Sequence, residues 1–156
     1  MSSPRRVVRV GGGTGGTVTM ELDVVNIVGD RHRITVRGHQ LEVDQPFTDG
    51  GSDAGPTPTE LFVASLASCV AHYARRGLGR AGEGPQVRCR WQMSDAKPWR
   101  VTAIDIEVDL PAGTPPERVA AVERAVSHCT VHNSIIQQPS ITIASTVGVP
   151  SRERAA

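Results

Sequence analysis

The sequence predicts a mixed fold in which β-sheets pack on helices, and three observations support this. Two stretches begin with helix-capping signals, at Thr57 and Thr114, and continue with apolar residues at helical spacing. Other segments alternate apolar and polar residues, which is the pattern of a half-buried strand. Only 3% of the residues are aromatic, so the core must come from Val, Ile, Leu and Ala, a composition that favours such sheets.

Length, charge and cysteine content narrow the class of protein. The 156 residues fit one domain, predicted over residues 1–150 with a tail at 151–156. A net charge of +1 argues against a nucleic-acid surface. No apolar run approaches the roughly 20 residues that span a bilayer, and the first residues lack the apolar part of a secretory signal. Three cysteines do not form a secreted disulfide framework, so we expect a cytoplasmic protein with no membrane partner.

The N-terminal part predicts short strands. Residues 7–10 and 18–28 flank the loop GGGTGG, which lacks the Lys-Ser/Thr of a phosphate-binding loop and is therefore interpreted as a turn between strands. Residues 31–43 alternate again, around a turn or bulge at the Gly-His pair. Side chains two apart in a strand share a face, so Arg33 and Arg37 would project together from this segment.

A long helix is expected to organise the chain. A loop rich in turn-forming residues, 44–56, leads to Thr57, where a proline at the next position and Glu60 complete a capping box. The helix should end near Gly77, after two arginines. Apolar residues cover almost every side of it, which predicts burial all round, with Cys69 near its centre.

The remaining elements follow the same two patterns. Residues 86–93 and 99–110 alternate and are expected to pair as a hairpin, with Cys89 facing the sheet interior. The helix that begins after Thr114 should carry Cys129 on its buried side, at or near its C-terminal end. A further turn over residues 131–137 and a last strand over residues 140–149 complete the prediction.

Two helical cysteines admit three interpretations. Both residues could be small buried hydrophobes, the commonest state of a free cysteine. They could form a redox pair, which requires their α-carbons to lie within about 7 Å. They could also bind zinc, because Cys69 and His72, like Cys129 and His132, have the C-x-x-H spacing that places thiolate and imidazole one helical turn apart.

Three motifs carry a resemblance to a known family. The runs GPTPTELFVASLASC, GHQLEVDQPFTDGGSDAGP and SHCTVHNSI resemble the OsmC/Ohr family of organic hydroperoxide reductases, in order and spacing, over about residues 33–147. The resemblance implies a two-layer α+β fold with curved antiparallel sheets around two central cysteine-bearing helices. It also implies an intertwined homodimer with two active sites at its interface. Cys69 matches the peroxidatic cysteine of the family, and Cys129 matches its resolving cysteine.

The same resemblance suggests how the first thiol is activated. A thiol in an apolar helix interior needs a cation to favour its charged form, and the family uses an arginine from the N-terminal half, held by a glutamate at the start of the central helix. The arginine would be Arg37, or secondly Arg33, and the glutamate Glu60. The aligned glutamate position falls on Thr59, one residue earlier, a departure that resembles a less characterised branch of the family. His72, one turn beyond the first cysteine, is an alternative partner.

The resemblance therefore predicts a cysteine peroxidase. The Cys69 thiolate would attack an organic hydroperoxide, Cys129 would form a disulfide with the resulting sulfenic acid, and a lipoyl-type or thioredoxin-type dithiol would reduce that disulfide. Apolar residues such as Phe62 and Leu66 would favour alkyl or lipid hydroperoxides. No metal, flavin or haem would be required. The alternatives are a redox-inactive relative that binds a small hydrophobic ligand, and the Cys2His2 zinc protein.

Overall fold

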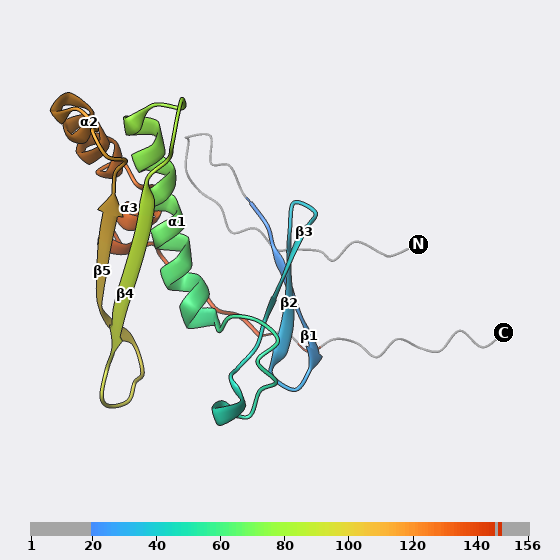
Figure 1. Ribbon diagram of the computed structural model, residues 1–156. Coiled ribbons are helices and arrows are strands. Elements are labelled where there is room, and N and C mark those ends of the chain that lie inside the picture. Colours follow the sequence, from blue (N-terminus) through green and yellow to red (C-terminus); the bar gives the residue numbers. More distant parts are fainter. Residues whose placement is uncertain (1–19, 146, 148–156) are drawn as a thin grey trace. The chain divides into compact units, whose positions relative to one another are not determined.

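The computed structural model describes residues 20–145 and 147 of the chain (Figure 1). The chain divides into two compact units, an N-terminal unit of residues 1–56 and a C-terminal unit of residues 57–156. Together they contain antiparallel sheets and helices, which confirms the predicted α+β class. The strand expected at residues 7–10 lies outside the described residues.

The N-terminal unit contains a three-stranded antiparallel sheet. Its strands β1 (Asp23–Val28), β2 (Arg31–Val36) and β3 (His39–Val43) pair in the order β1-β2-β3. Arg37 and Gly38 join the last two strands with φ angles of 48° and 82°, as in a two-residue type I′ hairpin turn. Arg37 therefore lies in the turn, and the prediction that it shares a strand face with Arg33 is wrong. The turn begins one residue earlier than the sequence indicated.

The loop after β3 is organised by a buried carboxylate. Asp44 is 1% exposed and accepts hydrogen bonds from the backbone N–H groups of Gln45, Ser52 and Ala54 and from the hydroxyl of Ser52. These bonds, with the Ser52 hydroxyl as the largest contribution, lower the pKa of Asp44 to about 2. Position 51 requires glycine, because the Cβ of any other residue there would overlap the backbone of Gln45.

The C-terminal unit is built around helix α1 (Pro58–Leu78). Its predicted capping box is present: the Thr57 hydroxyl accepts from the Glu60 N–H, and the Glu60 carboxylate accepts from the Thr57 N–H at 2.7 Å. The helix continues one residue beyond Gly77 and is capped by Gly79. Arg75 then stabilises the following loop by donating to three of its backbone carbonyls.

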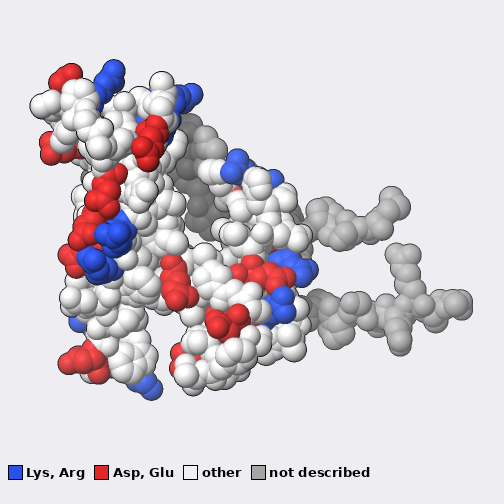
Figure 2. Space-filling view, viewed as in Figure 1, with Lys and Arg blue, Asp and Glu red and all other residues white. Residues whose placement is uncertain are grey.

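Four further elements pack on α1 in this unit. The strands β4 (Gln86–Met93) and β5 (Val101–Asp109) form the predicted antiparallel hairpin, and the helices are α2 (Pro116–Val126) and α3 (Thr130–Ile136). All four contact α1, and Figure 1 shows the hairpin running alongside it. The outer face of the hairpin carries both charge signs (Figure 2), including cross-strand ion pairs from Arg88 and Arg90 to Glu107.

Helix α1 is buried along one stripe only. Its buried residues recur at helical spacing: Val63, Leu66, Val70 and Ala74. Phe62, in contrast, is 42% exposed. The expectation that the helix is buried on every side is therefore wrong for a single chain, because the elements that pack on it cover only part of its circumference.

The second predicted helix differs from expectation at both ends. Thr114 does not cap it: its hydroxyl donates to the carbonyl of Pro111, and α2 has Pro115 at its N-cap position. The helix ends at Val126, so Cys129 does not lie at its end but at the N-cap position of α3. Residues 140–145 and 147 form no strand, so the last predicted strand is wrong over these positions.

None of the helices among the described residues combines the length and apolar character needed to cross a membrane.

Candidate functional site

The structure brings Cys69 and Cys129 together. Cys69 lies in the middle of α1 and is half-buried, whereas Cys129, at the start of α3, is 0% exposed. Both pack in one apolar cluster with Leu66 and Val70, and the Cys69 side chain acts directly on the pKa of the Cys129 thiol. Both are free thiols. Two sulfurs that are far apart in the sequence therefore meet at the contact between two helices.

The two thiols have different surroundings. Burial is the main cause that raises the pKa of Cys129, and the neighbouring Cys69 raises it further. The backbone N–H groups of Val131 and His132, at the start of α3, act in the opposite direction but do not outweigh burial. Cys129 is therefore a protonated thiol at neutral pH, closed to solvent, while Cys69 keeps part of its surface accessible.

The third cysteine stands apart from this pair. Cys89 lies on β4 opposite Ile106 of β5, which agrees with its interpretation as a strand residue. Burial, followed by the charge of Asp105, raises the pKa of the Cys89 thiol. Cys89 is not among the residues of the cluster that contains the other two cysteines, so it is a suitable control for experiments on them.

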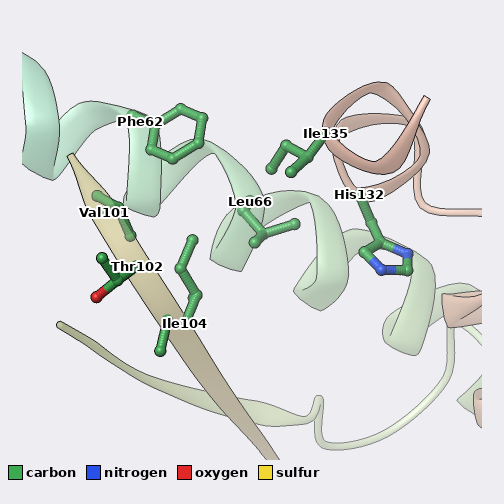
Figure 3. Close-up of a pocket in the computed structure, with 8 residues that line it drawn as sticks. Phe62, Leu66, Val101, Thr102, Ile104, His132 and Ile135 are labelled. Carbon is green, nitrogen blue, oxygen red and sulfur yellow. The ribbon is translucent and has the colours of Figure 1, made fainter. Parts of the chain in front are cut away.

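An apolar hollow borders the cysteine cluster. Its volume is about 290 Å³. Figure 3 shows side chains of α1, β5 and α3 around it: Phe62, Leu66, Val101, Thr102, Ile104, His132 and Ile135. Leu66, Ile104 and Ile135 line this hollow and also belong to the cluster that contains both cysteines. A small organic molecule in the hollow would therefore lie next to the residues that surround the sulfurs.

The arginine candidates lie in the N-terminal unit. Arg33 donates to the Glu42 carboxylate at 2.8 Å, and Arg31 binds the same carboxylate. These two arginines, Arg33 first, lower the pKa of Glu42. Arg37 is exposed in the β2–β3 turn. The sequence interpretation missed Glu42, although a strand register that places it opposite Arg33 would have revealed the pair.

Glu60 has a structural role that the sequence also indicated. Its carboxylate accepts from the Thr57 N–H and so completes the capping box of α1. Thr59, where the family resemblance would place the glutamate, lies next to it in the first turn. The role of Glu60 in holding an arginine, and that of Arg37 in activating the thiol, remain predictions.

The zinc interpretation does not fit the geometry. Across residues 20–145 and 147, no group of three or more His, Cys, Asp or Glu side chains is arranged to hold a metal ion. The His72 ring packs roughly perpendicular to the Tyr73 ring, with centroids 5.5 Å apart, and His132 lines the apolar hollow. The two C-x-x-H pairs therefore do not combine into one four-ligand site.

Comparison with solved structures identifies the fold. An OsmC-like protein from Mycoplasma pneumoniae has a TM-score of 0.65 at 12% identity, covering 78% of this chain and 89% of its own. A Psychrobacter arcticus protein, described as a candidate osmotic stress induced and detoxification response protein, has a TM-score of 0.65 at 20% identity, with coverages of 78% and 90%. An organic hydroperoxide resistance protein, OsmC, from Legionella pneumophila has a TM-score of 0.58 at 17% identity, with coverages of 76% and 89%.

Sequence comparison gives the family itself. The comparison with curated proteins finds no match. The family model described as "OsmC-like protein" matches residues 50–144, more than half of the 156 residues. This match includes α1, the β4–β5 hairpin, α2 and α3, and hence both cysteines of the cluster. The chain therefore belongs to the family of OsmC-like proteins.

Proposed function

We propose that this protein is a cysteine peroxidase that reduces organic hydroperoxides to alcohols. The observation that carries the proposal is the meeting of Cys69 and Cys129 in one apolar cluster beside an apolar hollow. A solved relative of the same fold, from Legionella pneumophila, is named as an organic hydroperoxide resistance protein. Membership of the OsmC-like family and the paired thiols both support thiol-dependent reduction of organic hydroperoxides.

The difference in burial supports a division of roles. The accessible Cys69 thiolate attacks the distal oxygen of the hydroperoxide, the O–O bond breaks, and the alkoxide leaves as an alcohol after taking up a proton. Cys69 is then a sulfenic acid. The Cys129 sulfur bonds to the Cys69 sulfur, and the S–O bond breaks to release water. An external dithiol, of the lipoyl or thioredoxin type, restores both thiols by exchange.

The surroundings of Cys129 suit the resolving role. Its raised pKa and its lack of exposure make it a poor nucleophile toward a peroxide in solution. Once Cys69 is oxidised, the electrophilic sulfur lies next to it, and the Val131 and His132 N–H groups favour the thiolate that must form. We assign the hollow to the organic part of the substrate, since burying each methylene contributes about 0.8 kcal/mol.

Activation of Cys69 requires a cation that favours its thiolate form. Arg37 is the preferred cation because Arg33 is already paired with Glu42. Glu60 would hold it, in addition to capping α1. Replacing Arg37 with Ala should slow the first oxidation step while leaving the disulfide-forming step unchanged, and Arg37→Lys should restore part of the rate.

Thiol titration after a single turnover tests the proposal. Reduced protein is mixed with one equivalent of cumene hydroperoxide, and free thiols are counted by alkylation and mass spectrometry. We expect Cys69 and Cys129 to be lost together, Cys129→Ser to stop at a Cys69 sulfenic acid, and Cys89→Ser to behave as the unmodified protein. If Cys69 and Cys129 both stay reduced, the peroxidase proposal is wrong.

The hollow also supports one alternative, a redox-inactive protein that binds a small hydrophobic ligand. Such a protein would retain an apolar ligand without converting a hydroperoxide, and Cys69→Ser would not reduce binding. Comparing ligand retention with turnover in the same variant separates the two functions.

A further inference from the structure

A hydrogen bond between two side-chain hydroxyl groups joins the two cysteine-bearing segments. The hydroxyl groups of Tyr73 and Thr130 lie 3.1 Å apart, and either of them can donate. Tyr73 is on α1, four residues after Cys69, and residues with this spacing are neighbours on one helix face. Thr130 is the first residue of α3 and directly follows Cys129. The bond therefore links the helix that carries Cys69 to the residue that follows Cys129.

Helix α3 is too short to be stable by itself and depends on contacts with the rest of the unit. It has seven residues, far fewer than the roughly 12 to 15 that make an isolated helix even marginally stable. Its other side-chain hydrogen bonds are local: Asn133 donates to the Ser127 carbonyl and Ser134 to the Thr130 carbonyl. The Tyr73–Thr130 bond joins a side chain of α3 to a side chain of α1, in addition to the interaction between the Cys69 and Cys129 side chains.

The phenol itself is held in place. The Tyr73 ring packs against the apolar cluster that contains Cys129. The rings of Tyr73 and His72 are roughly perpendicular, with centroids 5.5 Å apart and an interplanar angle of 89°, and the Arg76 guanidinium lies 6.0 Å from the centroid of the Tyr73 ring. A fixed ring gives its hydroxyl a defined position relative to α1, and therefore relative to Cys69.

We propose that Tyr73 and Thr130 are positioning residues that hold Cys129 against Cys69 for disulfide formation. This rests on the proposed function, in which the Cys129 sulfur bonds to the Cys69 sulfenic sulfur, the S–O bond breaks, and hydroxide takes the thiol proton to leave as water. The hydrogen bond closes the loop of residues 73–130, which is nearly the loop of residues 69–129 that the disulfide closes. The hydrogen bond therefore meets part of the loop-closure cost before the sulfurs react.

A redox equilibrium measures this effect without any peroxide. In glutathione buffers, the protein dithiol reacts with one glutathione disulfide to give the protein disulfide and two molecules of glutathione. The equilibrium constant of this exchange gives the effective concentration of one protein thiol at the other. We expect Tyr73→Phe to lower this effective concentration about fivefold, the factor that one ordinary hydrogen bond contributes. Thr130→Val should lower it equally, and the double variant should fall no further.

Matched variants separate positioning from general damage. Thr130→Ser keeps the hydroxyl and should retain the effective concentration of the unmodified protein. Ser134→Ala removes a hydroxyl from the same helix without touching α1, and should also change nothing. Thermal unfolding of each reduced variant shows whether it is folded. If Tyr73→Phe does not fold, Thr130→Val tests the proposal in its place.

The rate of disulfide formation can be compared after oxidation with a hydroperoxide. After one equivalent of cumene hydroperoxide, a sulfenic-acid trap should capture about five times more Cys69 in Tyr73→Phe, because the competing disulfide forms more slowly. An unchanged effective concentration in both Tyr73→Phe and Thr130→Val, or additive effects in the double variant, would overturn the inference. If unmodified protein forms the disulfide from glutathione disulfide but hydroperoxide oxidises neither thiol, the proposed peroxidase function fails and the positioning role stands.

Discussion

At the scale of single residues, the site depends on the unequal exposure of two sulfurs. Cys69 is half-buried and Cys129 is fully buried, so an oxidant from solution reaches the first more easily than the second. The raised pKa of Cys129 strengthens this order. Residue type alone cannot supply such a distinction, since the sequence predicted both cysteines on apolar helix faces.

Replacing Cys69 should abolish the reaction with hydroperoxide, whereas replacing Cys129 should abolish only turnover. Cys69→Ser should lower the peroxidase kcat/KM by roughly three orders of magnitude or more, because it removes the nucleophile. Cys129→Ser should still consume one equivalent of hydroperoxide but lose turnover with a dithiol. Steady-state assays beside single-turnover assays check this, and equal loss of both activities in Cys129→Ser would contradict the assigned roles.

Ionisation of Asp44 makes the stability of the fold depend on pH. Its pKa in the folded protein is about 2, below its ordinary value of 3.8, so the ionised carboxylate stabilises the fold. This stabilisation is complete well above pH 3.8 and is lost as the pH falls toward 2. Asp44→Asn should therefore lower the Tm near pH 6, and the difference from the unmodified protein should shrink as the pH falls through this range.

Unfolding scans at several pH values measure the effect. Asp49→Asn, a change at an exposed position in the same loop, is the matched control and should leave the Tm nearly unchanged. A constant difference between Asp44→Asn and the unmodified protein from pH 6 to pH 2 would show that ionisation of Asp44 is not the cause.

At the scale of elements, the close contact of α1 and α2 rests on a glycine. A Cβ at Gly77 would lie 2.6 Å from the Cα of Val122 and 2.7 Å from the carbonyl oxygen of Ala121. Gly77→Ala should therefore push the helices apart and destabilise the protein by about 1–3 kcal/mol. Urea unfolding measures this, with Gly84→Ala as a control, because a Cβ there meets only the Arg75 side chain at ordinary distances. Equal stability of the two variants would contradict the packing argument.

Local sequence signals predicted some elements well and others poorly. The capping box at Thr57 predicted the start of α1, and alternation predicted the β4–β5 hairpin, because these signals act within a few residues. Thr114 has the same Thr-Pro-x-Glu pattern but instead bonds the carbonyl of Pro111. Helix α3 is too short to show periodicity, so the sequence did not reveal Cys129 as its N-cap.

At the scale of the whole molecule, a single chain leaves much apolar surface uncovered. Exposed large hydrophobic residues lie in both units, on α1 and throughout β1: Val24, Val25, Ile27, Val28 and Phe62. Large exposed apolar areas mark interaction surfaces. The predicted homodimer would cover such surface, and sedimentation analysis should give twice the mass of one chain. A monomer at micromolar concentration would contradict this prediction.

The candidate site was predictable only in part. The family resemblance selected Cys69 and Cys129 from three cysteines, and the structure brings these two together. Arg37 stays a prediction as the activating cation, and the sequence did not reveal that Arg33 is engaged by Glu42, because that pairing depends on the strand register. The Tyr73–Thr130 contact was also missed, since no local pattern links residues on two separate helices.

Mapping the disulfide shows whether hydroperoxide reduction joins Cys69 to Cys129. Reduced protein is treated with one equivalent of cumene hydroperoxide, digested without reductant, and examined by mass spectrometry, while the alcohol formed is measured in the same sample. We predict one peptide pair that joins Cys69 to Cys129 and one equivalent of alcohol. A disulfide that involves Cys89, or alcohol formed without any Cys69–Cys129 link, would contradict the account.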